Sequence, residues 1–164
     1  MKTRLAALAV TVLTALALVF GLSVSSASAT VNNSCSSLGV SLGRANGAAG
    51  SLYVPIRFTN TSGHTCRIFG FPGVSLTRAN HTQIGLSAAR DYSVAETHVT
   101  LAPGHYVSAI LRIVNAGNYP PSVCAPVTSS FLRVIAPDKT LSHFLPFHKG
   151  TCSKPIRTLF IRPV

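Results

Sequence analysis

Apolar and polar residues alternate most clearly between residues 52 and 58. The apolar positions are Leu52, Val54, Ile56 and Phe58, and Tyr53, Pro55 and Arg57 lie between them. A period of two predicts a β-strand that packs one face against a core. Pro55 has no N–H to donate to a neighbouring strand, so the sequence predicts that this strand lies at a sheet edge or carries a bulge here.

Shorter apolar runs of the same kind recur along the chain, with turn residues about every 8–12 positions. Together they predict about eight or nine short strands, the longest of them at 105–114, where alternate residues are again apolar. No helical period of 3.6 residues occurs after residue 29. We therefore expect an all-β fold, an antiparallel β-sandwich of the immunoglobulin-like kind, with an up-and-down β-barrel as the alternative.

The first 29 residues differ from the rest. Lys2 and Arg4 precede an uninterrupted run of apolar and small residues at 5–22, and the segment ends in Ala27-Ser28-Ala29. This arrangement is typical of a cleaved secretory signal peptide. The alternative is an uncleaved anchor, for which the run is at the short limit of what spans a bilayer. We expect a secreted mature chain, residues 30–164, folded as a single domain.

Four cysteines remain in that mature chain: Cys35, Cys66, Cys124 and Cys152. An even number of cysteines in an exported protein predicts disulfides, and four cysteines allow three pairings. We favour Cys35–Cys66 and Cys124–Cys152, because both loops are then short and do not interleave. Their spacing is too wide for a zinc knuckle, and no metal or other cofactor is expected.

The mature chain is strongly basic. Removing Lys2 and Arg4 from the 14 basic residues leaves 12, which against three acids gives 12 − 3 = +9. Such a charge favours adsorption to anionic surfaces such as envelope polymers. The alternative is that the charge only keeps a secreted protein soluble.

Four arginines, Arg57, Arg112, Arg133 and Arg157, fall within predicted strands. If those strands are neighbours, the arginines line one sheet face as an anion-binding stripe, with Tyr53 on the same face as Arg57. Guanidinium groups bind phosphate and carboxylate well. The alternative is four scattered surface arginines. Nucleic acid is not the favoured partner, because no known nucleic-acid-binding module is present.

The sequence offers little for catalysis. Its three acids, Asp91, Glu96 and Asp138, form no paired-carboxylate motif, and no Gly-x-Ser-x-Gly elbow occurs. His98 and His105 flank a turn, but two histidines make a poor metal site. We therefore expect a protein that is not an enzyme.

Four features, in this order and spacing, resemble the secreted actinobacterial DUF4232 family, a family of unknown function. They are Cys35, the turn Asn60-Thr-Ser-Gly-His-Thr-Cys66, the turn Gly70-Phe-Pro-Gly-Val74 and the turn Leu101-Ala-Pro-Gly104. The late pair Cys124 and Cys152 fits as well. The resemblance implies export and a β-rich fold, and it brings no catalytic residues.

Taken together, these features predict a secreted, disulfide-stabilised binding or envelope-associated domain without enzymatic activity. A binder of anionic polymers, acting through the basic surface, is the first alternative. An exported hydrolase and a protease inhibitor are two further alternatives.

Overall fold

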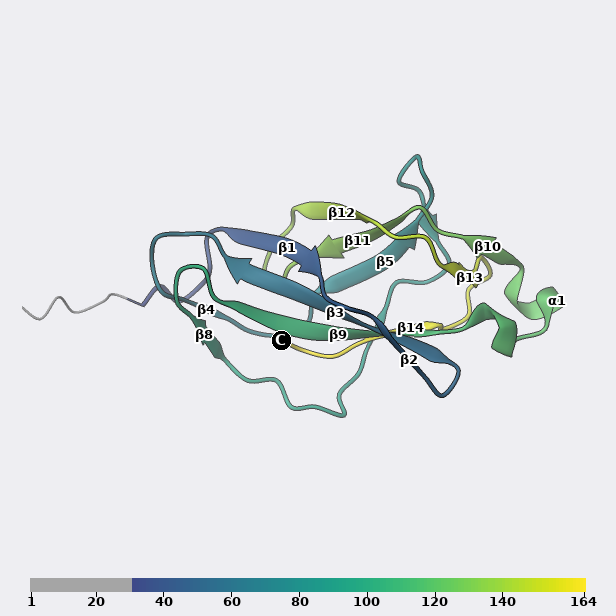
Figure 1. Ribbon diagram of the computed structural model, residues 1–164, viewed down its shortest axis with the longest axis horizontal. Coiled ribbons are helices and arrows are strands. Elements are labelled where there is room, and N and C mark those ends of the chain that lie inside the picture. Colours follow the sequence, from purple (N-terminus) through teal and green to yellow (C-terminus); the bar gives the residue numbers. More distant parts are fainter. Residues whose placement is uncertain (1–30) are drawn as a thin grey trace, which may run out of the picture.

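The computed structural model describes residues 31–164, so the predicted signal peptide lies outside the described residues. Strands dominate these residues and form two layers, a larger sheet and a smaller one (Figure 1). The sheets are open at their edges and do not close into a barrel. The prediction of an antiparallel β-sandwich is therefore confirmed, and the barrel alternative is wrong.

The large sheet has the strand order β1-β3-β9-β14-β7, and β2 pairs with β3 beside β1. Its strands are β1 (Leu38–Leu42), β2 (Asn46–Ala48), β3 (Ser51–Asn60), β7 (Ala89–Arg90), β9 (Tyr106–Val114) and β14 (Leu159–Ile161). All of its pairs are antiparallel except β14 with β7. The two longest strands, β3 and β9, are neighbours in its middle.

The small sheet has the order β12-β11-β5-β6. Its strands are β5 (Gly73–Thr77), β6 (Gln83–Ile84), β11 (Phe131–Ile135) and β12 (Ser142–Pro146). Two short ladders close the ends of the sandwich: β4 (Cys66–Ile68) with β8 (Val99–Leu101), and β10 (Pro126–Thr128) with β13 (Gly150–Cys152). Figure 1 shows β4 and β8 at one end and β10 and β13 at the other.

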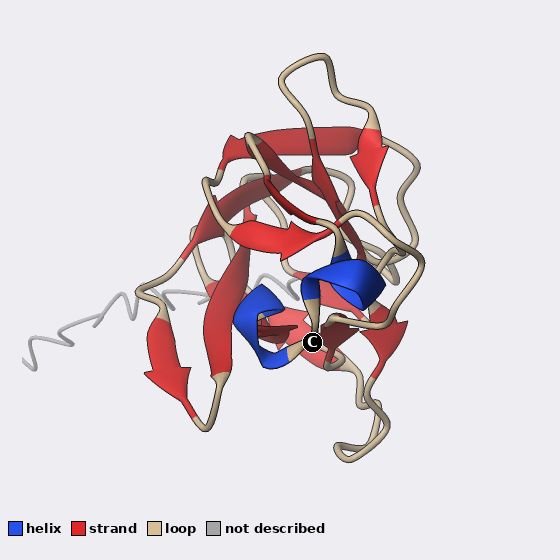
Figure 2. Ribbon diagram, turned by 90° about the vertical axis from the view of Figure 1, so that its right-hand side faces the viewer, coloured by secondary structure: helices blue, strands red, loops and turns tan. Residues whose placement is uncertain are grey.

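Two short helical turns follow β9, in a part of the chain where the sequence predicts no helix. They are the 3-10 turn η1 (Ala116–Asn118) and the single-turn helix α1 (Pro121–Cys124), and they lie together at one end of the sandwich (Figure 2). Pro121 stands at the start of α1, where a missing N–H costs nothing and the fixed φ suits a helix. A single turn is too short to produce a period in the sequence, so the pattern did not reveal it.

The core lies between the two sheets. On β3, Val54, Ile56 and Phe58 are fully buried, as the alternation predicted. Leu111 of β9 and Leu132 of β11 bring the neighbouring strand and the opposite sheet into the same cluster. Each buried aliphatic or aromatic side chain of this size stabilises the fold by about 1.5–3 kcal/mol.

The prediction that Pro55 marks an edge strand is wrong, because β3 pairs on both sides. On one side β1 ends opposite Ile56 and β2 begins opposite Tyr53. Pro55 lies at the interruption between them, and its carbonyl accepts a hydrogen bond from Gly43 at 2.8 Å. The missing N–H therefore interrupts the neighbouring strand, and β3 itself continues unbroken.

The cysteines pair as the loop lengths favoured, Cys35 with Cys66 and Cys124 with Cys152. The first disulfide belongs to the main core, whereas the second joins the end of α1 to β13. Closing loops of this size stabilises a fold by roughly 3–4 kcal/mol each, mainly by restricting the unfolded chain.

Two of the turns in the sequence signature meet in space. The buried Asn60 side chain donates to the carbonyls of His64 at 2.8 Å and Leu101 at 3.0 Å, and its oxygen accepts from the Ser62 hydroxyl at 2.7 Å. The Gly104 N–H donates to the Asn60 carbonyl at 2.8 Å. Asn60 thus orders its own turn and joins it to the Leu101–Gly104 turn, so this part of the signature is structural.

Candidate anion-binding face

The four candidate arginines do not form one stripe, so that interpretation is wrong as a whole. Arg57 of β3 and Arg112 of β9 lie on neighbouring strands of the large sheet, both on the face away from the core. Arg133 belongs to β11 of the small sheet, and Arg157 lies exposed in the chain before β14. The structure brings together two of the four.

Around Arg57 and Arg112, the strand register gathers three aromatic residues. Tyr53 lies directly opposite Arg112 on β3, and Phe160 of β14 lies opposite Arg112 on its other side. Tyr106 belongs to the same outward row of β9. We call this set, Tyr53, Arg57, Tyr106, Arg112 and Phe160, the basic face. Arg57 and Arg112 are four residues apart in register, roughly 13 Å along the strands.

Each arginine of the basic face lies over an aromatic ring. The guanidinium carbon of Arg57 is 4.9 Å from the centroid of the Tyr106 ring, and that of Arg112 is 4.2 Å from the centroid of Phe160. Such cation–π contacts fix the side chain and leave the two terminal nitrogens of the guanidinium to bind an anion. Tyr106 is 54% exposed, so this part of the face is open to solvent.

Gly43 allows Arg57 to lie flat on the sheet. A Cβ at Gly43 would be 3.0 Å from the Pro55 Cβ and 3.3 Å from the Arg57 Nε. The Arg57 Nε is buried and makes no hydrogen bond to any residue in the range 31–164. A larger residue at this position would displace the arginine from its ring.

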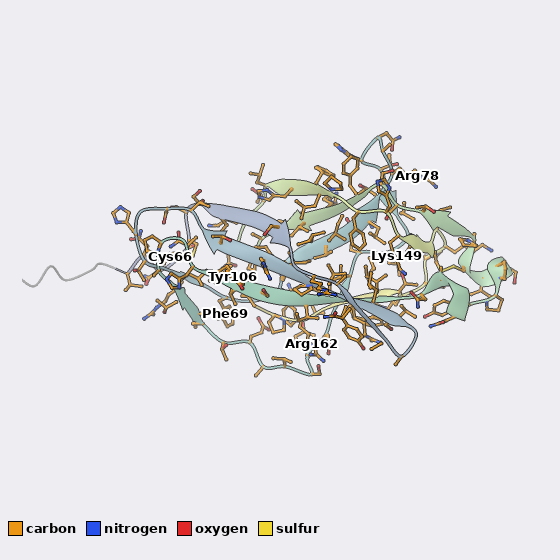
Figure 3. The ribbon with its side chains drawn as sticks, in the orientation of Figure 1. Cys66, Phe69, Arg78, Tyr106, Lys149 and Arg162 are labelled. Atoms are coloured by element: carbon orange, nitrogen blue, oxygen red, sulfur yellow. A yellow bond between two sulfur atoms is a disulfide. The ribbon has the colours of Figure 1, made fainter. Side chains whose placement is uncertain are left out.

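Carboxylates lie away from the Arg57 and Arg112 side chains. Glu96 lies beside Gly70, and Asp138 is exposed in the turn between β11 and β12. Asp91 is 3.3 Å from the Arg162 Nε, the one ion pair found within residues 31–164. Figure 3 shows Arg162 and Tyr106 in the layer of the large sheet, and Arg78 on the hairpin loop of the other layer.

Asp91 is held in its charged form. Hydrogen bonds from the Ser93 hydroxyl and backbone N–H, followed by the Arg162 guanidinium, hold the pKa of Asp91 below its ordinary value. Arg162 comes directly after β14, and its N–H donates to the Ile110 carbonyl at 3.1 Å, so it borders the basic face. Its charge is paired, whereas no ion pair among the described residues involves Arg57 or Arg112.

Arg133, on the other sheet, is tied down by its own surroundings. Its Nη2 donates to the Gln83 side-chain oxygen at 3.1 Å. Because β5 lies between β11 and β6, this bond crosses over β5, where the buried hydroxyls of Ser75 and Thr77 have no hydrogen-bond partner among residues 31–164. The His81 ring stacks on Phe144 at 3.9 Å beside them. We call the set His81, Gln83, Phe131, Arg133 and Phe144 the closed face.

The histidines do not assemble a metal site. His98 stacks on Phe69 at 4.4 Å, and within residues 31–164 no three histidine, cysteine or acidic side chains cluster as metal ligands would. A cavity of 240 Å³ lies between β1 and β12, and its lining includes His143 and Lys139 but no carboxylate. No pattern in the sequence indicated this cavity, because its walls come from segments about 100 residues apart.

The aromatic partners of the two arginines, Tyr106 and Phe160, were also missed, and Tyr53 was the one aromatic residue that the sequence placed on this face. The sequence pattern did indicate that Arg57 and Arg112 point away from the core, because both lie between apolar residues in strands where apolar and polar positions alternate. Which ring lies under each guanidinium depends on strand register, and register between distant strands is not visible in a single sequence.

Comparison with models of known protein families identifies the family of this chain. The model of a domain of unknown function, DUF4232, matches residues 34–164. The chain belongs to the DUF4232 family. No curated protein and no solved structure matches the chain. Two disulfides in a DUF4232 domain are consistent with an oxidising, extracellular environment. None of the helices between residues 31 and 164 has the length and apolar character needed to span a bilayer.

Proposed function

We propose that this DUF4232 domain is an exported, non-enzymatic module that binds anionic polymers of the cell envelope through the basic face. The observation that carries the proposal is the pair Arg57 and Arg112, each held on an aromatic ring of an open sheet face and neither engaged in an ion pair with residues 31–164.

Export is supported by the small-x-small ending of residues 1–29 and by the two disulfides, which persist in oxidising compartments. The resemblance of the sequence to secreted actinobacterial proteins agrees with this. A mature chain of net charge +9 outside the cell meets anionic envelope polymers at high local concentration.

Binding by the basic face is supported by preorganisation. A guanidinium that lies flat on a ring loses little conformational freedom when it binds an anion. Two such groups, carried by residues roughly 13 Å apart along the strands, can contact one polymer at two places, so a long polyanion binds more tightly than a single phosphate. The +9 charge adds a long-range attraction that salt screens.

The positions of the acidic residues support a non-enzymatic role. Asp91 is engaged with Ser93 and Arg162, and no carboxylate lines the cavity that contains His143. A hydrolytic site would need a carboxylate or another base within hydrogen-bond reach of its nucleophile.

The test measures binding of the mature protein to inorganic polyphosphate over a range of salt concentrations. We expect the logarithm of the affinity to fall linearly with the logarithm of salt concentration, as charge neutralisation requires. In Arg57→Gln/Arg112→Gln the slope should decrease by about 1.5, close to 0.7–0.9 per lost contact. The control Arg78→Gln/Arg157→Gln removes the same charge from exposed positions off the basic face.

Comparing the two double variants separates a specific role of the basic face from an effect of net charge. If both double variants lose the same affinity, the net charge acts alone and the basic face has no special role. If the wild type does not bind, or binds independently of salt, the polyanion mechanism is wrong. In producing cells, the protein should leave the envelope in a salt wash, and the Arg57→Gln/Arg112→Gln variant should be found mainly in the medium.

A further inference from the structure

Within residues 31–164, the two sheets end on the same side of the sandwich in strands that each have one unpaired edge. β1 is the last strand of the large sheet and β12 the last strand of the small sheet. The cavity of 240 Å³ opens between these two edges. Its lining residues are Ser36, Ser37, Leu38, Ala136, Lys139, Thr140, Leu141 and His143.

The free edge of β1 presents backbone groups that pair with no other strand among the described residues. Thr61 donates to the Ser37 carbonyl at 3.2 Å, and Gly43 donates to the Pro55 carbonyl at 2.8 Å. In an antiparallel pair the bonded residues alternate, so the odd-numbered residues of β1 face β3. The N–H and C=O groups of Leu38, Val40 and Leu42 therefore point away from the sheet.

Nothing in the β1 sequence protects this edge. Natural edge strands are blunted by charged residues, proline or a covering segment. β1 reads Leu-Gly-Val-Ser-Leu and contains neither a charge nor a proline. Beside it, Leu141 at the cavity is 69% exposed, an unusual exposure for a leucine next to a free strand edge.

The cavity has a basic character. Lys139 and His143 line it together with the hydroxyl-bearing Thr140, and no carboxylate does. The Lys139 Nζ makes one hydrogen bond, to the Ser34 hydroxyl at 3.1 Å, which leaves two of its donors for a ligand. Asp138 precedes Lys139 in the turn, but it is exposed and does not line the cavity.

We infer that the β1 edge binds an extended acidic peptide by strand addition. The peptide backbone pairs with Leu38, Val40 and Leu42, and every second side chain points between the sheets. One of these side chains, a glutamate or aspartate, enters the cavity and its carboxylate contacts Lys139 and His143. The apolar walls from Leu38 and Leu141 receive the methylene groups of that side chain.

This site is separate from the basic face, and its test needs no polyanion. The probe is the peptide acetyl-Thr-Val-Thr-Glu-Thr-Val-Thr-amide, with an otherwise identical peptide containing Gln in place of Glu. We expect the amide hydrogens of Leu38, Val40 and Leu42 to exchange more slowly when the Glu peptide is bound. The Glu peptide should bind about five- to tenfold more tightly than the Gln peptide, because a charged hydrogen bond is stronger than a neutral one.

Two substitutions locate the contacts. Lys139→Gln should remove most of the preference for Glu, while Lys154→Gln, which changes an exposed lysine near Ser122, should keep it. Val40→Pro removes one outward N–H without removing a bond to β3, so it should weaken both peptides equally. The Lys139→Gln result stands on its own if Val40→Pro impairs folding.

Several outcomes would overturn the inference. One is unchanged exchange of the three amides with either peptide, and another is equal affinity for the two peptides. A Glu preference that is lost in Arg57→Gln/Arg112→Gln but kept in Lys139→Gln would place the acid on the basic face. Protection of the same amides in a peptide-free dimer, detected by sedimentation, would make the edge a contact between two copies of this chain.

Discussion

The outer faces of the two sheets carry the same kinds of residue and use them in opposite ways. On the basic face, Arg57 and Arg112 lie on rings, without an ion pair among the described residues. On the closed face, Arg133 donates to Gln83 across β5, and His81 stacks over Phe144. An arginine on a strand is thus available to a ligand only where its neighbours leave its guanidinium unengaged.

The difference between the two faces arises from the side chains that lie on the strands next to each arginine. Arg57 has Ser108 opposite, a side chain too short to reach over a neighbouring strand. Arg133 is two strands from Gln83, and both side chains are long enough to meet above β5. The same residue type therefore makes a side-chain hydrogen bond on one face, and on the other face it lies on an aromatic ring.

The largest effect on polyphosphate affinity is expected when a carboxylate is introduced next to an arginine of the basic face. In Ser108→Glu a carboxylate stands directly opposite Arg57, where cross-strand side chains are about 5 Å apart at Cβ. It should pair with Arg57 and repel phosphates, which lowers the affinity for polyphosphate roughly tenfold, or about 1.4 kcal/mol. Titration with polyphosphate at fixed salt measures this change.

Two controls accompany this variant. Ser108→Gln has the same shape without the charge and should keep most of the affinity. Gln83→Glu adds the same charge on the closed face, beside Arg133, and should change the affinity much less than Ser108→Glu. Equal losses for both glutamate variants would mean that net charge alone governs binding, and the contrast between the two faces would not hold.

A smaller effect, on stability, is expected on the closed face. Arg133→Ala removes the hydrogen bond to Gln83 and uncovers β5, at a cost of about 1 kcal/mol in the free energy of unfolding. Polyphosphate affinity should stay close to that of the wild type. Thr77→Val replaces a buried hydroxyl that has no hydrogen-bond partner in the described part of the chain, and it should leave stability unchanged or raise it.

Chemical denaturation of the variants measures both changes. A loss of polyphosphate binding in Arg133→Ala at unchanged stability would show that the closed face is also a binding surface. A destabilised Thr77→Val would mean that its hydroxyl has a partner in solution, and the account of the covered β5 would be wrong.

The sequence predicted the parts of the fold that depend on local pattern. The alternation in β3 and β9 and the short loops between cysteines were sufficient for two strands and two disulfides. Sheet membership was not predictable in the same way, because the partner of β11 is β5, more than 50 residues earlier. Arg133 was therefore assigned to the wrong face.

The failures at single residues have the same physical origin. The role of Pro55 depends on a break in a neighbouring strand, and the ring under Arg112 is set by its register with Phe160. Two- and three-residue strands such as β7 and β13 are too short for a period of two to be visible. Local pattern thus predicts which residues point outward, and tertiary pairing decides what they meet.

The smallest expected effect concerns Arg162, which borders the basic face but is paired. Asp91→Asn should release this guanidinium and raise the affinity for polyphosphate about twofold, a gain in the range of a surface ion pair. Asp138→Asn makes the same change of charge in an exposed turn and should have a weaker effect. Equal gains in both variants would show that Arg162 takes no part in binding.

The difference in stability between the wild type and Asp91→Asn should depend on pH in a defined direction. Because the pKa of Asp91 is lowered in the folded state, its ionised form stabilises the fold above the unfolded pKa of about 4. This contribution is lost as pH falls through the lowered folded pKa, so wild type and Asp91→Asn should differ slightly at neutral pH and converge in acid. Thermal unfolding at a series of pH values measures the difference. A difference that grows in acid would contradict the contacts assigned to Asp91, and with them the distinction between a paired arginine at the border and two unpaired ones on the basic face.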